Sequence, residues 1–269
     1  MSSSRYVAFS SSANNLVAND TNSAQDVFVR DRTTSRTVRV SVSTSGGQNA
    51  DASGSPAISS SGRYVAFITA LGETAPRVFV RDRDTDADGV FDEPGAVRTT
   101  RVPSDVNVYA PSISANGRHV TYNETDQDDP GAPFVHDLKT GRTVPVAVSN
   151  TAATTPYSGE TTRNAISGNG RYVTFASGAG GLVVGDTNGT EDVFVRDRDT
   201  DADGIFDETG AVSTARASIS SADVQGNGLS AAAVIAEYGT YVAFASEATN
   251  LSLATDSNGT WDVFTRTNP

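Results

Sequence analysis

Short apolar runs alternate with polar turns along the whole chain. The runs are rich in Val, Phe, Tyr and Thr, and residues such as Gly, Ser, Asn and Asp separate them. No long segment places apolar residues at the 3.6-residue spacing of an amphipathic helix, whereas runs of this length and composition are typical of β-strands. The pattern therefore predicts an all-β fold.

Two of these runs recur five times, which indicates a chain built from repeated units. The first has the form Arg-Tyr-Val-Ala-Phe and lies at Arg5–Phe9, Arg63–Phe67, Arg118–Tyr122, Arg171–Phe175 and Thr240–Phe244. The second has the form Val-Phe-Val-Arg-Asp and lies at Val27–Asp31, Val78–Asp82, Pro133–Asp137, Val193–Asp197 and Val263–Thr267. Successive copies of the second run are 51 to 70 residues apart. Repeats of this length are typical of propeller blades or solenoids.

Two further strands complete each predicted unit. An inner stretch of small residues precedes the first run, at Ala57–Ser59, Ser112–Ser114, Ala165–Ser167 and Ala233–Ile235. A tight turn such as Asn116-Gly117 joins the two, because both residue types tolerate a positive φ. An outer strand follows the second run, at Thr37–Ser43, Val97–Val102, Thr143–Ser149 and Val212–Ser218. Because the first unit lacks the inner strand and the last lacks the outer one, we expect 18 strands in units of three, four, four, four and three.

The repeated pattern, I-S-x-x-G-R-Y-V-A-F…D-V-F-V-R-D…T-x-R-V-S, resembles the TolB-type family of β-propeller repeats over essentially the whole chain. The resemblance implies four-stranded antiparallel blades whose inner strand lines a central channel. We expect one β-propeller domain over residues 1–269, with approximate blades 1–56, 57–111, 112–164, 165–229 and 230–269. Five blades with a thin first and last blade fit best; a fragment of a larger ring and a ring closed by a partner remain alternatives.

The most distinctive segment is an acidic loop that occurs twice. Residues 78–89 are identical to residues 193–204, and each copy continues into the pattern D-x-D-x-D-G-x-x-D. The expected oxygen ligands in the first copy are the carboxylates of Asp84, Asp86, Asp88 and Asp92 and the carbonyl of Val90. In the second copy they are the carboxylates of Asp199, Asp201, Asp203 and Asp207 and the carbonyl of Ile205.

Oxygen ligands at alternate positions around a glycine bend suit Ca²⁺, which takes six to eight oxygens. The loops are not EF-hands, because Gly95 and Gly210 stand where the bidentate glutamate belongs. They resemble the calcium loops of integrin α-chain propellers, which use the same nine-residue pattern. We therefore predict two Ca²⁺ ions with a structural role. The alternative is a pair of solvated acidic hairpins without an ion.

Charge and composition narrow the classes of partner. The formal net charge is −12, and residues 82–93 and 197–208 contribute −5 each, so the remainder is nearly neutral. Nucleic acid is not expected as a partner, because it needs a basic surface. The chain has no Cys and no apolar run long enough to span a membrane. The segment Met-Ser-Ser-Ser-Arg lacks the layout of a signal peptide, so we expect the leader of an exported protein to be absent from this chain.

Three weaker signals recur or break the pattern. Asp20-Thr21-Asn22, Asp186-Thr187-Asn188 and Asp256-Ser257-Asn258 predict Asx-type turns, with further cation sites or ligand contacts as alternatives. The repeated tyrosines Tyr6, Tyr64, Tyr172 and Tyr241 predict packing between blades. His119 and His136 replace the Tyr and Arg of the repeat, which favours packing over a metal or catalytic pair.

These features favour a calcium-stabilised, non-catalytic β-propeller that binds or scaffolds a protein or glycan ligand at its face or channel. An extracellular or periplasmic location is expected, where calcium is plentiful. One alternative is a carbohydrate-active or other propeller enzyme, but the inner stretches are small and apolar and carry no pair of acids. A lectin is a further alternative. The sequence predicts no catalytic residue.

Overall fold

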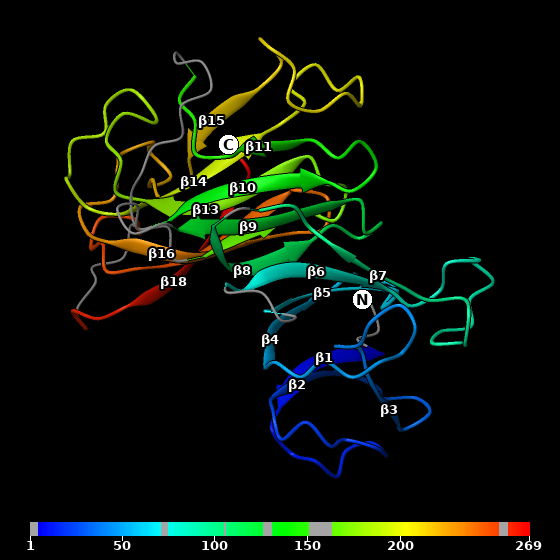
Figure 1. Ribbon diagram of the computed structural model, residues 1–269. Helices are drawn as coiled ribbons and strands as arrows, with labels where there is room; N and C mark the ends of the chain where they lie inside the picture. Colours follow the sequence, from blue (N-terminus) through cyan, green and yellow to red (C-terminus); the bar gives the residue numbers. More distant parts are fainter. Residues whose placement is uncertain (1–4, 71–74, 105, 126–130, 151–162, 253–257) are drawn as a thin grey trace.

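The computed structural model describes residues 5–70, 75–104, 106–125, 131–150, 163–252 and 258–269 (Figure 1). Within these ranges the regular structure is all β, and no helix is long and apolar enough to cross a membrane. Each of five antiparallel sheets is called a blade and is numbered in chain order.

Blade 1 holds β1 (Tyr6–Ser11), β2 (Asp26–Asp31) and β3 (Arg36–Arg39). Blade 2 holds β4 (Ser53–Ile58), β5 (Tyr64–Thr69), β6 (Arg77–Asp82) and β7 (Arg98–Arg101). Blade 3 holds β8 (Asn107–Ile113), β9 (His119–Thr125), β10 (Ala132–Asp137) and β11 (Thr143–Pro145). Blade 4 holds β12 (Asn164–Ile166), β13 (Tyr172–Ser177), β14 (Asp192–Asp197) and β15 (Ser213–Arg216). Blade 5 holds β16 (Ser230–Ile235), β17 (Tyr241–Ser246) and β18 (Asp262–Thr267).

Strand order within every blade follows the chain, which confirms the predicted units of three, four, four, four and three strands among the described residues. The two repeated runs form the central hairpin of each blade. Their aromatic residues lie directly opposite each other, as in the pairs Phe67–Phe79 and Phe175–Phe194. The rings stack with centroids 6.1 and 5.6 Å apart, and cross-strand aromatic pairs of this kind stabilise a sheet.

The same hairpin explains the repeated arginine and aspartate. In blades 1 to 4 the arginine before the first run pairs with the aspartate that ends the second run: Arg5–Asp31, Arg63–Asp82, Arg118–Asp137 and Arg171–Asp197, at 2.6–2.7 Å. The hydrogen bonds from Arg5 lower the pKa of Asp31 well below its usual range. Blade 5 has Thr240 and Thr267 at these two positions.

Neighbouring blades meet where an aromatic ring packs on a turn glycine. A Cβ added to Gly62 would lie 2.1 Å from the Tyr6 ring, and one added to Gly117 would lie 2.2 Å from the Tyr64 ring. Both glycines have a positive φ, +79° and +71°. The packing of tyrosines between blades is thus confirmed at these positions, and the close approach leaves no room for a side chain on the glycine.

The strand boundaries differ from expectation at the inner and outer strands. The outer strands β3, β7, β11 and β15 are shorter than predicted because the chain leaves the sheet after three or four residues. The inner strands β4 and β8 begin at Ser53 and Asn107, so the approximate blade boundaries at 57 and 112 fall inside them. Both strands contain a bulge, where Ser55 and Ala110 adopt positive φ values of 49° and 50°.

The five blades pack in chain order, each on the next, and the described strands of blade 5 make no substantial contact with those of blade 1. In Figure 1, blade 1 (blue) lies at the bottom of the view and blade 5 (orange to red) on its left side. Blade 5 therefore has an uncovered face. Val263 is 79% exposed there, whereas Val78 and Val193 at the same position of earlier blades are buried.

Candidate metal centre

The two acidic loops connect the third and fourth strands of blades 2 and 4, as the sequence predicts. The first acidic loop, residues 82–93, lies between β6 and β7, and the second, residues 197–208, lies between β14 and β15. One carboxylate oxygen from each of three aspartates falls within 4.8 Å of the others, at Asp84, Asp86 and Asp88 and again at Asp199, Asp201 and Asp203. The structure thus brings three of the four predicted carboxylates of each loop together.

Backbone N–H groups hold the first aspartate of each loop in place. Asp84 accepts hydrogen bonds from the N–H groups of Asp88 and Gly89, both at 3.2 Å. Asp199 accepts the equivalent bonds from Asp203 and Gly204 at 3.1 Å. Asp84 and Asp199 are buried, whereas the other two aspartates of each group are exposed. The backbone of each loop therefore fixes the carboxylate of its first aspartate, while the other two carboxylates face solvent.

Gly89 is the residue that makes this bend possible. Its φ of +89° lies in the left-handed region, as does the +86° of Gly204 in the second loop. Glycine adopts this conformation without the steric cost that a Cβ brings. Val90 and Ile205 follow directly and point their side chains to solvent, 51% and 55% exposed. Their carbonyls remain predicted ligands.

The fourth predicted carboxylate of each loop has a different partner in the structure. Asp92 faces Arg83, whose Nε and Nη2 donate to its two oxygens at 3.0 and 2.5 Å. Asp207 faces Arg198 in the same way, with an Nη2–Oδ2 distance of 2.6 Å. Both arginines are buried and need a counter-ion. The carboxylates at position nine thus neutralise an arginine, and their additional role as metal ligands remains a prediction.

The buried arginine links the loop to a turn of its own blade and to a ring of the preceding blade. Arg83 Nη1 donates to the carbonyl of Gly62 at 2.7 Å, and its guanidinium lies over the rings of Phe91 and Tyr6. Phe91 comes from the first acidic loop and Tyr6 from blade 1, and their ring centroids are 5.4 Å apart. The phenylalanine of the first acidic loop therefore packs against the preceding blade.

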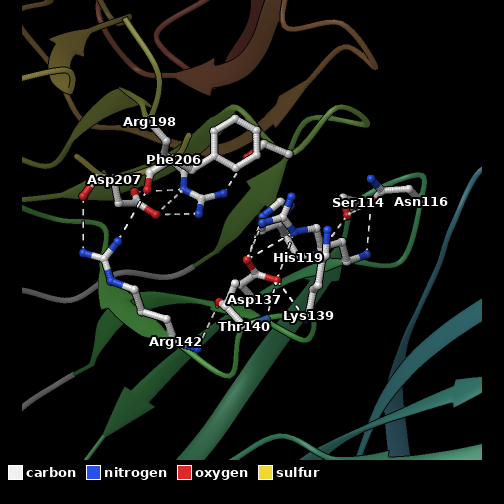
Figure 2. A network of polar contacts seen from close by, with 12 residues as sticks. Ser114, Asn116, His119, Asp137, Lys139, Thr140, Arg142, Arg198, Phe206 and Asp207 are labelled. Carbon is white, nitrogen blue, oxygen red and sulfur yellow. Dashed lines mark hydrogen bonds and ion pairs between the residues drawn. The ribbon is translucent and has the colours of Figure 1, made fainter. Parts of the chain in front are cut away.

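Figure 2 shows the equivalent contact in blade 4. Arg198 Nη1 donates to the carbonyl of Gly170 at 2.6 Å, and its guanidinium lies over Phe206. Phe206 packs edge-on against His119 of blade 3, with centroids 4.9 Å apart. Arg142, also from blade 3, donates from Nη2 to the backbone carbonyl of Asp207 at 3.2 Å. We call the group Arg198, Asp207, Phe206 and His119 the blade 3–4 contact.

The negative charge of the second acidic loop affects the pKa of Glu208. Partial burial and the nearby carboxylates of Asp203, Asp201 and Asp199 raise its pKa. A raised pKa means that ionisation of Glu208 is opposed by its surroundings. A cation between these carboxylates would remove that opposition.

The Asp-Thr-Asn elements form the predicted Asx turns. Asn22 Oδ1 accepts a hydrogen bond from Ala24 N, and Asn188 Oδ1 accepts one from Thr190 N, both at 3.1 Å. Asp256 and Ser257 lie outside the described residues. The buried Asp26 pairs with Arg39 at 3.1 Å in blade 1, and Asp192 pairs with Arg216 at 3.3 Å in blade 4. Because an arginine already neutralises these aspartates, the geometry favours an internal ion pair over a further cation site.

The two histidines have separate partners. His136 Nδ1 lies 2.8 Å from Thr143 Oγ1 on the outer strand of blade 3. His119 is buried in the blade 3–4 contact, and a Cβ on Gly170 would lie 2.4 Å from its Nδ1. His119 thus packs on a glycine as the repeated tyrosines do, which agrees with the predicted packing role. Burial and the charge of Arg198 lower the pKa of His119 to about 3.

Replacing His119 with tyrosine is expected to make the protein more resistant to acid. The folded pKa of about 3 lies below the ordinary value, so the unfolded chain binds the proton more readily. The stability associated with neutral His119 is therefore complete above about pH 6.5 and is lost as the pH falls toward 3. At pH 5 the loss is on the order of 2 kcal/mol.

Blade 1 has Tyr6 at the position of His119, and the Tyr6 ring packs against Phe91 of the first acidic loop. The same chain therefore already accommodates a tyrosine at this position. Urea unfolding at pH 7.5 and pH 5 measures the difference. The variant should lose less stability between the two pH values than the natural protein. His136 is present in both proteins, so its own titration cancels. An equal loss in the two proteins would show that His119 does not sense pH.

Comparisons with known proteins support the fold. TolB from Acinetobacter baumannii has a TM-score of 0.56 and 15% identity over 98% of this chain and 51% of its own length. A putative TolB from Agrobacterium tumefaciens has a TM-score of 0.50 and 14% identity over 90% of this chain and 70% of its own. The tricorn protease has a TM-score of 0.52 and 12% identity over 90% of this chain and 22% of its own.

This chain therefore has a TolB-like β-propeller fold, and it spans about half the length of the Acinetobacter protein. No model of a known protein family matches it, and no curated protein matches it either.

Proposed function

We propose that this chain is a calcium-stabilised, non-catalytic β-propeller that binds a protein or glycan ligand in an extracellular or periplasmic setting. The observation that supports the calcium role most directly is the gathering of Asp84, Asp86 and Asp88 within 4.8 Å, repeated at Asp199, Asp201 and Asp203. Like charges at this separation repel each other unless a cation lies among them. Carboxylate and carbonyl oxygens are the ligands that Ca²⁺ prefers.

A stabilising role for the ion follows from where the loops are attached. Each acidic loop carries a phenylalanine that packs on the preceding blade, Phe91 on Tyr6 and Phe206 on His119. An arginine of the same loop, Arg83 or Arg198, lies over that phenylalanine. Fixing the loop with an ion also fixes these residues. Calcium would thus hold blade 2 on blade 1 and blade 4 on blade 3.

The inner strands support a binding role over a hydrolytic one. The described strands β4, β8, β12 and β16 are built from small, apolar and amide residues with one tyrosine, Tyr109, and carry no carboxylate or histidine. Hydrolysis of a glycosidic bond generally uses a pair of carboxylates. A ligand that needs only shape and hydrogen bonds is compatible with such a surface.

Calcium is expected to raise the melting temperature of the protein. At a free concentration of about 100 times the Kd, one site adds about 2.7 kcal/mol to the free energy of unfolding. For a chain of this size, two such sites correspond to a rise in Tm of roughly 10 °C or more. Differential scanning calorimetry in calcium and in EDTA measures it, with Mg²⁺ as the comparison ion.

The matched variants carry asparagine at Asp84, Asp86 and Asp88, at Asp199, Asp201 and Asp203, or at all six positions. Each single-loop variant should keep about half of the calcium effect, and the variant of both loops should lose it. Melting curves that coincide in calcium and in EDTA would overturn the calcium role. Kd values of roughly 10⁻⁴ to 10⁻³ M would suit an extracellular module. A glycan array then separates a glycan ligand from a protein ligand.

A further inference from the structure

Two pockets that are built in the same way lie beside the acidic loops. The first pocket, of about 270 Å³, lies between the outer strand β3 of blade 1 and the first acidic loop. The second pocket, of about 260 Å³, lies between the outer strand β11 of blade 3 and the second acidic loop. Every residue that lines the second pocket has its counterpart in the lining of the first.

Each pocket combines an arginine with apolar side chains from two elements. The outer strand contributes Arg36 and Val38 to the first pocket, and the acidic loop contributes Val90 and Phe91. The tripeptide Arg-Thr-Val at residues 36–38 recurs at residues 142–144. The corresponding side chains of the second pocket are Arg142, Val144, Ile205 and Phe206. The same set of groups therefore occurs twice in one chain.

The acidic loop, and not the blade junction as such, makes this pocket. Blades 2 and 3 also meet, but only the short connection 138–142 joins β10 to β11. The depression at this junction is larger, about 370 Å³, and its described lining contains no phenylalanine. Arg98 and Thr100 stand there at the positions of Arg36 and Val38. An arginine on the outer strand thus has an apolar wall opposite it only where an acidic loop follows.

The first pocket holds one positive charge without a carboxylate partner. Its lining includes three arginines and two aspartates, which gives a net charge of +1. Arg5 pairs with Asp31 at 2.7 Å, and Arg83 pairs with Asp92 at 2.5 Å. Arg36 is exposed, and its guanidinium makes no hydrogen bond or ion pair with the described part of the chain. This guanidinium is therefore available to an anionic group.

The second pocket repeats the arrangement of charges. Ion pairs occupy two of its arginines, Arg118 and Arg198. The third, Arg142, donates only to the backbone carbonyls of Phe206 and Asp207, at 3.4 and 3.2 Å (Figure 2). A hydrogen bond between a guanidinium and a carboxylate is shorter and about twice as strong as a bond between neutral groups. A carboxylate of a ligand would therefore displace these long bonds.

An apolar side chain of the ligand has a place beside each guanidinium. Val90 and Ile205 expose more than half of their surface, and each lines its pocket together with a valine of the outer strand. Burial of such exposed apolar surface by a ligand is favourable. Both volumes lie below the roughly 300–1,000 Å³ of pockets for drug-sized ligands, so one or two side chains suit them better than a large cofactor.

A peptide suits this lining better than a sugar. A sugar is usually held by packing its C–H groups on the electron-rich face of an aromatic ring. The guanidinium of Arg83 already lies over the Phe91 ring, 5.0 Å from its centroid, and the Tyr6 ring packs against it at 5.4 Å. The Phe206 ring is occupied in the same way. Each pocket thus offers aliphatic side chains and one guanidinium, which complement an apolar and an acidic residue.

We propose that the two pockets bind protein segments in which an aspartate or glutamate adjoins an apolar residue. The carboxylate binds Arg36 in the first pocket and Arg142 in the second. The apolar side chain packs between the valine of the outer strand and the exposed apolar residue of the acidic loop. Because the pockets are equivalent, each chain binds two such segments. This ligand class rests on the binding role proposed above, which it makes more specific.

The aspartates of the acidic loops oppose an anionic ligand when no cation lies among them. Asp84, Asp86 and Asp88 bring three negative charges to the loop that forms one wall of the first pocket, and one Ca²⁺ cancels two of them. Binding is therefore measured in calcium. It is also measured in the variant with asparagine at all six loop positions, which lacks these charges whether or not the natural protein binds an ion.

The test titrates the isotope-labelled full chain with the peptide Ser-Gly-Glu-Leu-Gly-Ser, blocked at both ends so that the glutamate carries its only charge. NMR follows the amides of Gly89 and Gly204, which line the two pockets. Both amides should shift, and calorimetry should give two peptides per chain. Replacing the peptide glutamate by glutamine, or its leucine by serine, is expected to weaken binding about tenfold each, because the first removes a charged bond and the second removes apolar burial.

Three arginine variants locate the peptide. Arg36→Ala should abolish the shift of Gly89 and keep that of Gly204, whereas Arg142→Ala should do the reverse. Each should lower the number of bound peptides from two to one. Arg98→Ala, at the equivalent position of blade 2, should leave both sites unchanged. All three arginines are exposed, so the melting curves of the variants should stay close to that of the natural protein.

Equal affinity for the glutamate and glutamine peptides would overturn the inference, as would the absence of any shift in both the natural protein in calcium and the asparagine variant. Glucuronate that shifts the same amides at a lower concentration than the peptide would also overturn it, because the ligand would then be an acidic glycan. The melting curves keep the calcium role separate: a protein that melts higher in calcium and binds no peptide retains that role and contradicts only the ligand class.

Discussion

Arg198→Ala is expected to destabilise the protein by about 3 kcal/mol, a large effect for a single substitution. Arg198 is buried, and its side chain binds the Asp207 carboxylate and the Gly170 carbonyl while stacking on Phe206. Truncation leaves a largely buried carboxylate without a counter-ion and removes the bond to the turn between β12 and β13, the turn on which His119 of blade 3 packs. Both losses act at the blade 3–4 contact.

Urea unfolding of Arg198→Ala and Arg142→Ala measures the effect against a matched control. Arg142 contacts the same loop from blade 3, but it is exposed and its bonds to Phe206 and Asp207 carbonyls are long, 3.4 and 3.2 Å. We expect Arg142→Ala to cost less than about 1 kcal/mol. Equal costs for the two variants would show that the buried ion pair contributes nothing particular to the contact.

Gly117→Ala is expected to cost about 3 kcal/mol, again through an interblade contact. Gly117 has a φ of +71°, and its added Cβ would lie 2.2 Å from the Tyr64 ring. The left-handed backbone alone costs an alanine roughly 1–2 kcal/mol, and the collision with the ring adds an overpacking term of similar size. Tyr64 is fixed between two blades and cannot move away freely.

Gly141 supplies the control for this substitution. It has nearly the same φ, +74°, and its added Cβ would meet no atom within 4 Å. Gly141→Ala therefore reports the backbone cost alone, and the difference between the two variants reports the steric contact with Tyr64. If the two variants lose equal stability in urea, the tight packing between blades 2 and 3 does not contribute to the fold.

The repeats made most of the fold predictable. The two repeated runs indicated where the central hairpins lie, because the alternation of apolar and polar residues has the period of a strand. The Arg-Tyr and Arg-Asp positions carried the ion pairs of blades 1 to 4. The bulges at Ser55 and Ala110 and the early end of the outer strands were not predictable, because tertiary packing decides them.

The candidate metal centre was predicted in part. The spacing of Asp84, Asp86 and Asp88 indicated that their carboxylates gather, because alternate residues around a glycine bend face one centre. The partner of Asp92 was missed, since Arg83 becomes its neighbour only when the loop folds back on itself, with the Asp92 N–H bonded to the Arg83 carbonyl. A signal was present in the sequence: Phe91 is an apolar residue inside an otherwise charged loop, and Phe206 repeats it.

The outer strands also make a contact that the sequence pattern does not reveal. The outer strands of blades 1 to 4 each carry a threonine to which the repeat pattern alone assigns no role: Thr37, Thr99, Thr143 and Thr214. Its meaning depends on the arginine opposite, as in the pair Arg81–Thr99, and on a carbonyl of the previous blade. Such three-part contacts link residues far apart in the chain, so periodicity alone does not reveal them.

Direct measurement of bound calcium tests the central claim most simply. After equilibrium dialysis against calcium, elemental analysis should find two ions per chain in the natural protein. It should find one in the variant with asparagine at Asp84, Asp86 and Asp88 or in the one with asparagine at Asp199, Asp201 and Asp203, and none in the variant of both loops. No bound calcium in the natural protein, or two ions in the variant of both loops, would contradict the account.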